Sequence, residues 1–158
     1  MKIVIALAAL LGCVVSQAIA QPENGPKKWD ITTVDVSKLP PAATQTGVTF
    51  AKDIMPLLKT SCLGCHNAEH PKAGYKLDTL DNALKGGRDG VMIVPGDSQK
   101  SLFVVAVARI NPRLAMPPTP RGPRPGATNS PAATHLPPPP FSTANVALVR
   151  AWIDQGAK

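Results

Sequence analysis

Apolar residues recur at the spacing of an α-helix in the stretch VTFAKDIMPLLKTSC, which begins at Val48. Side chains three and four positions apart share one face of a helix, so this pattern predicts a helix with one buried side. We expect it to begin near Asp53 and to lead to Cys62, with Pro56 in the first turn, where proline is tolerated. Its apolar face consists of Phe50, Ile54, Leu57 and Leu58.

Two further stretches in the middle of the chain predict short helices. The stretch LDTLDNALKGG indicates a turn and a brief helix that stops at Gly86 and Gly87, because glycine favours helix C-termini. The stretch VPGDSQKSLFVVAVARI predicts a more apolar helix. It should start after the Pro-Gly pair, with Asp97 or Ser98 as its N-cap.

The clearest helix lies in the last part of the sequence. Ser142 or Thr143 can cap its N-terminus, and Gly156 can close its C-terminus. Its predicted buried face consists of Val146, Val149, Trp152 and Ile153.

The segments between these helices have other patterns. Residues 21–47 form an arm rich in Pro, Thr and Lys, in which WDITTVDV favours a β conformation. Ten of the eighteen prolines lie between positions 117 and 140, and proline removes backbone donors, so this segment should be an exposed loop. With a length of about one domain, the chain is predicted to be mainly α. Residues 48–158 would form a small helical domain with much coil and a Pro-rich loop at 117–140.

The first twenty residues predict a signal peptide. A basic start at Lys2 is followed by an apolar run from position 3 to 15 and by the small-residue ending Ala-Ile-Ala. Cleavage after Ala20 would export the protein to the periplasm or cell envelope. The apolar run is shorter than the roughly 20 residues that span a bilayer. The alternative is a lipoprotein signal, Leu-Leu-Gly-Cys, in which Cys13 would be lipidated and would attach the protein to the membrane.

The chain is basic, with 17 Lys and Arg against 10 Asp and Glu. Removing residues 1–20 takes away only Lys2, so 17 − 1 = 16 basic residues remain and the net charge is about +6. Aromatic residues make up only 4% of the chain and offer few surfaces for base stacking, so nucleic acid is not the expected partner. The charge favours an acidic protein partner, or serves solubility alone.

Several arginines fall in one stretch without acids. No Asp or Glu lies between Asp97 and Asp154. The hypothesis is that this stretch docks an acidic redox partner, and the alternative is ordinary solvation of a polar loop. The arginines concerned are Arg109, Arg113, Arg121, Arg124 and Arg150.

The stretch TSCLGCHNAEH contains Cys62, Cys65 and His66, and the two cysteines are the only ones after the predicted signal peptide. Cys-x-x-Cys-His is the signature of haem c attachment. The two thiols are spaced to reach the two vinyl groups of one porphyrin, and the histidine that follows can ligate the iron. The motif therefore predicts one covalently bound haem c.

The same residues could have other uses. A structural zinc site needs four ligands, and adding His70 and His135 gives a sparse set without the usual paired spacing. A redox-active dithiol normally opens a helix after a strand in a βαβ unit, which this chain lacks. The remaining alternative is a local disulfide beside an unrelated histidine. Export, a preceding helix and the absence of other mature cysteines favour haem.

A second axial ligand for the iron has few candidates. Met116 lies in Ala-Met-Pro-Pro, where two prolines hold its thioether outside any helix, so it is the favoured distal ligand. His135 is the runner-up, inside the Pro-rich loop. Met92 is expected in the core, and Met55 is too close to the motif to reach the opposite haem face. His70 is expected to be a solvated turn residue.

Several motifs in order give the chain a family resemblance. The run from VTFAKDIMPLLKTSCLGCHNAEHPKAGYKLDTLDNALKGGRDGVMIVPGDSQKSLFVVAV to AMPP and then ANVALVRAWIDQGA resembles the planctomycete-type cytochrome c domain, a branch of the small class I c-type cytochromes. The resemblance implies a helical fold around one haem, with Cys62 and Cys65 as thioether attachments, His66 as proximal ligand and Met116 as distal ligand. It also implies that Trp152 packs near the haem and the first helix. The long Pro-rich loop departs from the family pattern.

A haem with both axial positions filled has no site for substrate and suits outer-sphere electron transfer. The chain is therefore expected to be an exported monohaem electron carrier with redox protein partners, and not an enzyme. Two alternatives remain. If the long loop prevents ligation by Met116, the open iron would bind a gas or reduce peroxide. The domain could also serve as a haem-bearing docking subunit of a larger exported complex.

Overall fold

A computed structural model describes residues 29–119 and 138–158. This part of the chain contains helices, turns and coil and no β-strand, so the predicted mainly α fold is confirmed. The longest helix has 12 residues, and none of the described helices is long and apolar enough to cross a bilayer. The predictions for residues 1–20, and for the loop at 120–137, lie outside the described residues. The elements are η1 (Ile31–Thr33), η2 (Val36–Lys38), η3 (Phe50–Ile54), α1 (Met55–Ser61), η4 (Lys72–Gly74), α2 (Leu80–Lys85), α3 (Leu102–Ala108) and α4 (Thr143–Asp154).

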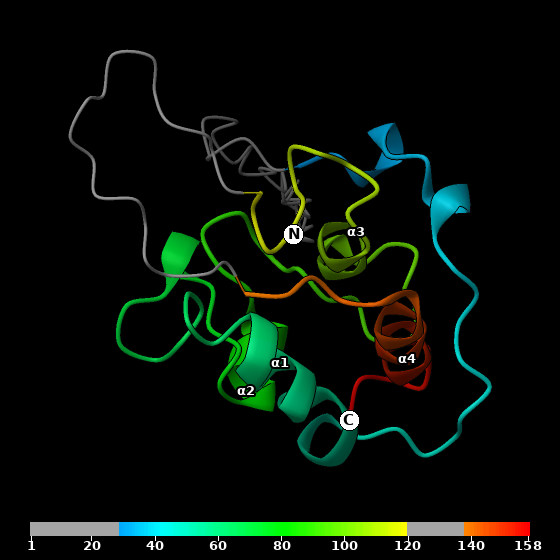
Figure 1. Cartoon of the computed structure of the whole chain (residues 1–158), viewed down its shortest axis with the longest axis horizontal. Coiled ribbons are helices and arrows are strands. Elements are labelled where there is room, and N and C mark those ends of the chain that lie inside the picture. Colours follow the sequence, from blue (N-terminus) through cyan, green and yellow to red (C-terminus); the bar gives the residue numbers. More distant parts are fainter. Residues whose placement is uncertain (1–28, 120–137) are drawn as a thin grey trace, which may run out of the picture.

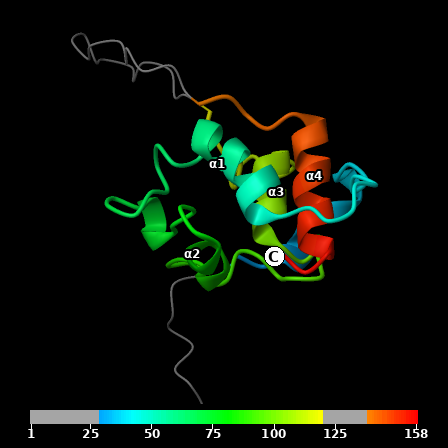
Figure 2. The ribbon, with the colours of Figure 1, turned by 90° about the horizontal axis from the view of Figure 1, so that it is seen from below.

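The centre of the fold is the pair α3 and α4, which lie side by side in both views (Figures 1 and 2). Every residue from Leu102 to Val107 is buried, as expected for a helix that is apolar on all sides. Its partners include α4 on one side and Ile31 and Val34 of the arm on another. The predicted face of α4 is buried as well, and Ser142 and Gly156 end the helix as predicted.

The helix that leads to Cys62 begins earlier than predicted, at Phe50 rather than near Asp53. Thr49 caps it by accepting a hydrogen bond from Lys52 N, while Asp53 Oδ2 accepts one from Thr49 N at 2.8 Å. An α-helical turn would need an N–H at position 56, where proline has none. The turn before Pro56 is instead widened to a π-helix, with five-residue spacing of its hydrogen bonds.

The start of α3 also differs from the prediction, because Ser101 precedes the helix and neither Asp97 nor Ser98 caps it. Ser98 is buried and bonds to Asp154 of α4, with N to Oδ1 at 2.7 Å and Oγ to Oδ2 at 3.0 Å. Asp97 caps the separate turn that comes before the helix. Asp97 and Ser98 therefore belong to a turn that contacts α4, and not to the N-terminus of α3. By contrast, α2 ends at Gly86 as predicted.

The predicted β conformation at residues 29–36 is wrong. The segment forms the 3₁₀ turn η1, and a second such turn, η2, follows it. Asp30 and Asp35 each accept a hydrogen bond from the backbone N–H two residues later, at 2.9 and 3.2 Å. Such side-chain bonds stabilise turns at the expense of extended strands, and they outweigh the β propensity of the valines and threonines.

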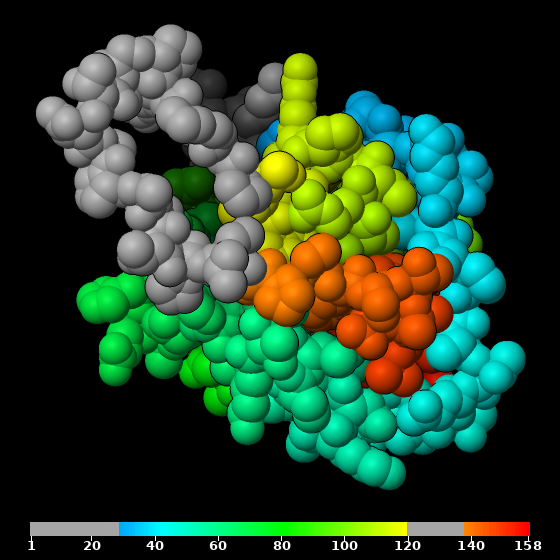
Figure 3. All heavy atoms as spheres, viewed as in Figure 1, coloured from blue at the N-terminus to red at the C-terminus, as the bar shows by residue number. Residues whose placement is uncertain are grey.

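The rest of the arm runs along α4. Ala43 N bonds to Ala147 O at 2.9 Å, and Gln155 Nε2 bonds to Gln45 O at 2.8 Å. The buried Arg150 donates to the carbonyl of Pro40 and, at 3.0 Å, to the hydroxyl of Ser98. On the face shown in Figure 3, residues 138–158 (orange to red) lie between the segment of η3 and α1 and the segment of residues 100–119. The arm, α3 and α4 therefore form one packed body.

Candidate haem site

The end of α1 positions the Cys-x-x-Cys-His motif. Cys62 terminates the helix, with its N–H bonded to Leu58 O at 2.8 Å. Its own carbonyl then accepts from Cys65 N at 3.0 Å and from His66 N at 2.9 Å. One backbone oxygen thus holds the turn of the motif together, and Cys62 is buried, with 9% of its surface exposed.

The imidazole of His66 has a defined orientation. Its Nδ1 lies 2.9 Å from the carbonyl oxygen of Tyr75, and its own carbonyl accepts from Leu77 N at 2.9 Å. A carbonyl can only accept, so Nδ1 carries the proton and the lone pair is on Nε2. Histidines that ligate metals usually donate their other ring N–H in this way, which fixes the ring and makes it a stronger ligand.

Tyr75 is in turn held firmly by its neighbours. Its hydroxyl donates to Ala83 O of α2 at 3.1 Å, and its ring packs edge-on against His66 with the ring centres 5.8 Å apart. Burial is the main reason that the pKa of Tyr75 lies above its ordinary value. On its other side, Gly87 approaches so closely that an added Cβ would lie 2.8 Å from Tyr75 Cβ. The carbonyl that orients His66 therefore belongs to a rigid segment.

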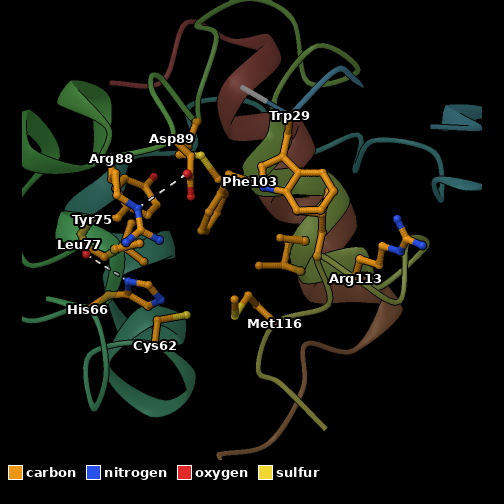
Figure 4. Close-up of a pocket in the computed structure, with 16 residues that line it drawn as sticks. Trp29, Cys62, His66, Tyr75, Leu77, Arg88, Asp89, Phe103, Arg113 and Met116 are labelled. Atoms are coloured by element: carbon orange, nitrogen blue, oxygen red, sulfur yellow. Dashed lines mark hydrogen bonds and ion pairs between the residues drawn. The ribbon is translucent and has the colours of Figure 1, made fainter. Parts of the chain in front are cut away.

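An apolar pocket opens beside the motif, with about 820 Å³ of empty space when the part open to solvent is included. Cys62, His66 and Met116 all line it, and Figure 4 shows His66 and Met116 on opposite sides of the space. Most of the remaining wall is apolar and includes Leu77, Phe103, Ala106, Val107 and Leu114. The structure therefore brings together three of the residues predicted for the site. Cys65 is half-buried and lies outside the lining.

Met116 lies in a loop that follows α3, outside any helix, as its prolines predict. Its N–H donates to Ala106 O at 2.9 Å, and the residue is 39% exposed. Met92 packs against the core, as predicted, and it also lines the pocket. In the sequence it lies between the exposed Val91 and the buried Ile93. The pocket thus contains two thioethers.

The other predicted residues lie elsewhere. Trp152 is buried against Phe50, with ring centres 5.7 Å apart, so its packing on the first helical segment is as predicted. It donates to Lys158 O at 2.9 Å and is not part of the pocket wall. His70 is exposed in a turn. His135 lies outside the described residues.

The wall of the pocket also contains residues that sequence analysis did not assign to it. Trp29 comes from the arm, and Arg88, Asp89 and Arg113 lie at the pocket (Figure 4). Trp29 had no sequence signal, because a single tryptophan among prolines and lysines does not indicate which surface it will cover. Only the packing of the arm against α3 brings it to the pocket.

The electrostatics of the cysteines disfavour the dithiol alternative. Burial, followed by the charge of Cys65, raises the pKa of Cys62 to about 12. Redox-active dithiols depend on the opposite shift, towards an accessible thiolate. In residues 29–119 and 138–158, no group of three or more His, Cys, Asp and Glu side chains could hold a metal ion, which gives no support to a zinc site there.

These donors fit a haem. A buried thiol, an imidazole with its Nε2 lone pair available and a thioether across an apolar space are the groups that attach and ligate haem c. The fold and the site are therefore those expected of a small helical haem-binding domain. Residues 62–120 match the family described as Planctomycete cytochrome C, so this part of the chain is a planctomycete-type cytochrome c domain.

The matching segment begins at Cys62 and extends just beyond Met116, so it includes the attachment motif and both thioethers of the pocket. Domains of this class bind haem and transfer electrons, and the match indicates that general role for the chain. No curated protein and no solved structure matches the chain.

Proposed function

We propose that this protein is an exported monohaem c-type cytochrome that carries electrons between redox proteins. The observation that carries the proposal is the placement of His66 and Met116 on opposite sides of one apolar pocket, with Cys62 in its wall. In this proposal, Cys62 and Cys65 form the thioether bonds, His66 is the proximal ligand and Met116 is the distal ligand.

The chain's own residues supply orientation and burial. The bond from His66 Nδ1 to Tyr75 O keeps Nε2 directed away from that carbonyl and available as a ligand. The apolar side chains of α3 line one wall of the pocket and would surround a bound haem with few polar groups on that side. A bound haem, held by His66 and Met116, would supply an iron that gains and loses one electron.

Some arginines of the basic stretch form hydrogen bonds within the fold, and we leave these out of the proposed docking surface. Arg150 is buried and bonded within the fold, and Arg109 donates to the loop after α3. Arg113 is exposed at the pocket, and Arg88 is largely exposed beside it, 3.9 Å from Asp89. The other two arginines of the stretch lie outside the described residues. The proposed surface for an acidic partner is therefore centred on Arg113 and Arg88.

Small redox probes of opposite charge can test this surface. We expect Arg113→Glu to slow oxidation of the reduced protein by anionic ferricyanide and to speed oxidation by a cationic cobalt(III) complex. Raising the ionic strength should shrink both effects. Rates that are equal in the variant and the wild type, with both probes, would remove Arg113 from the docking surface.

The exposure of Met116, 39%, favours one alternative, a haem whose distal position opens to a small ligand. In that case the protein would bind a gas or reduce peroxide. The absorption spectrum of haem-loaded protein, reduced and then exposed to carbon monoxide, separates the two functions. A spectrum that carbon monoxide leaves unchanged supports the electron carrier, and rapid binding supports the open site.

Variants of the two thioethers assign the distal ligand. Met116→Ala should keep covalent haem, bind carbon monoxide and have a lower reduction potential, because loss of the thioether removes a ligand that raises it. Met92→Ala is the matched control from the same pocket and should behave as the wild type. If Met92→Ala opens the iron and Met116→Ala does not, Met92 is the ligand. Replacing Cys62 or Cys65 by Ala should reduce stable haem incorporation.

A further inference from the structure

The loop that carries Met116 is closed onto the end of α3 by its backbone. Arg109 follows the helix in the left-handed region, with φ of 57°, and its N–H donates to Ala106 O at 3.2 Å. The same carbonyl accepts from Met116 N at 2.9 Å. The chain therefore leaves α3 at Arg109 and returns to it at Met116. This arrangement fixes the N-terminal side of the methionine.

The C-terminal side of Met116 cannot be held in the same way. Pro117 and Pro118 have no backbone N–H, so at these two positions the backbone offers carbonyl oxygens as acceptors but no amide donors. A side chain that anchors these two residues by a hydrogen bond therefore has to be a donor. A guanidinium is the side chain best suited, since it carries five N–H groups in a planar fork and accepts nothing.

Arg109 supplies that donor. Its Nη1 donates to Pro117 O, and its Nη2 donates to Thr119 Oγ1 at 2.9 Å. Pro117 is buried, whereas Met116 is partly exposed next to it. The ion pairs of the described residues involve other basic side chains, so these two bonds do not compete there with a carboxylate.

We infer that Arg109 is a positioning residue for the distal ligand: its guanidinium holds Pro117 and Thr119 so that the thioether of Met116 stays at the pocket. The inference rests on the proposed ligation by Met116. It assigns to Arg109 an internal role, in place of the partner docking expected from its position in the basic stretch. Without this anchor, the C-terminal side of Met116 is held only by the packing of Pro117, and Met116 would be a less firmly held ligand.

The variant that tests this role is Arg109→Asn. Asparagine tolerates the left-handed region better than most residues, so the backbone turn is kept while the guanidinium is lost. Thr119→Val removes one of the two acceptors and leaves Arg109 in place. Arg109→Lys restores a donor that can reach one acceptor at a time. Lys59→Gln, on the exposed face of α1, controls for the loss of one positive charge.

The readouts are the rate at which the reduced haem-loaded protein binds carbon monoxide, the methionine-to-iron charge-transfer band of the oxidised protein and the reduction potential. Hydrogen bonds from a charged donor contribute enough that Arg109→Asn should bind carbon monoxide about tenfold faster than the wild type. Its charge-transfer band should weaken and its potential should fall. Thr119→Val and Arg109→Lys should lie between Arg109→Asn and the wild type, and Lys59→Gln should match the wild type.

A further control separates positioning from general destabilisation. Ser142→Ala removes the cap of α4, whose hydroxyl accepts from Asn145 N at 3.2 Å, and so lowers stability without touching the loop. It should leave carbon monoxide binding unchanged. If Arg109→Asn behaves like Ser142→Ala while Met116→Ala opens the iron, the positioning role is wrong and the proposed ligation stands. If Met116→Ala leaves the iron closed, the ligation itself is wrong, and the role of Arg109 falls with it.

Discussion

Replacing Gly87 by alanine should destabilise the protein through a steric clash at the segment that orients His66. The new Cβ would lie 2.8 Å from Tyr75 Cβ and 2.9 Å from Ala73 O. Ordinary contacts of a Cβ begin at 3.4 Å, so the two segments must separate by 3.4 − 2.8 = 0.6 Å. Since Tyr75 Cα also lies at 3.0 Å, rotation of a side chain cannot relieve the clash, and the backbone has to move.

The magnitude follows from the cost of overpacking, about 1 to 3 kcal/mol. For a domain of this size, such a loss lowers Tm by roughly 5 to 15 °C. Movement of Tyr75 also lengthens the hydrogen bond from His66 Nδ1, which is 2.9 Å in the structure. We therefore expect a shift of the reduction potential together with the lower Tm.

Gly64→Ala is the matched control, from the middle of the Cys-x-x-Cys motif. An added Cβ there meets nothing within 4 Å, so this variant should be neutral or more stable by about 0.4 to 1 kcal/mol, since alanine reduces the entropy of the unfolded chain. Thermal unfolding of both haem-loaded variants, followed by circular dichroism, makes the comparison. Equal Tm values for Gly87→Ala and Gly64→Ala would refute the steric argument.

Three further predictions concern other parts of the molecule. Ser98→Ala should lower the free energy of unfolding by about 1 to 3 kcal/mol in urea titration, because it removes the hydroxyl that accepts from the buried Arg150 Nε at 3.0 Å and donates to Asp154. The pKa of Asp97 lies below its ordinary value of 3.8, chiefly because of hydrogen bonds with Lys100. The ionised carboxylate therefore stabilises the fold fully well above pH 3.8, and this stabilisation is lost as the pH falls through the lowered pKa. Asp97→Asn should reduce the difference in Tm between pH 6 and pH 2. Mass spectrometry of the exported protein should show cleavage after Ala20, whereas a lipidated N-terminus at Cys13 would contradict the simple signal peptide.

The parts of the fold that depend on local chemistry could be predicted from the sequence. Ser142 and Gly156 bound α4 as expected, because caps act on residues within a turn of themselves. The Cys-x-x-Cys-His motif is equally local, and its position at the end of α1 agrees with the apolar pattern before it. Met116 lies outside any helix, as its two following prolines predict.

The parts that depend on tertiary contacts could not be predicted. Ser98 resembles an N-cap in the sequence, and only Asp154, 56 residues later, explains why it serves another purpose. Met92 reads as a core residue because its neighbours are apolar, and the pocket exists only once α3 lies across from the motif. From the sequence, Arg150 is expected to be an exposed cation, whereas in the structure it donates to a carbonyl and a hydroxyl from distant segments.

The arm before residue 48 contributes to the wall of the pocket and therefore belongs to the domain. Trp29 lines the pocket and is 42% exposed, although it lies 33 residues before Cys62, where the family match begins. A domain that began at residue 48, the predicted boundary, would lack Trp29 and therefore part of the pocket wall. A unit to be transplanted into a fusion protein therefore has to start at or before Trp29, since a shorter one would expose its porphyrin to solvent and alter the driving force for electron exchange.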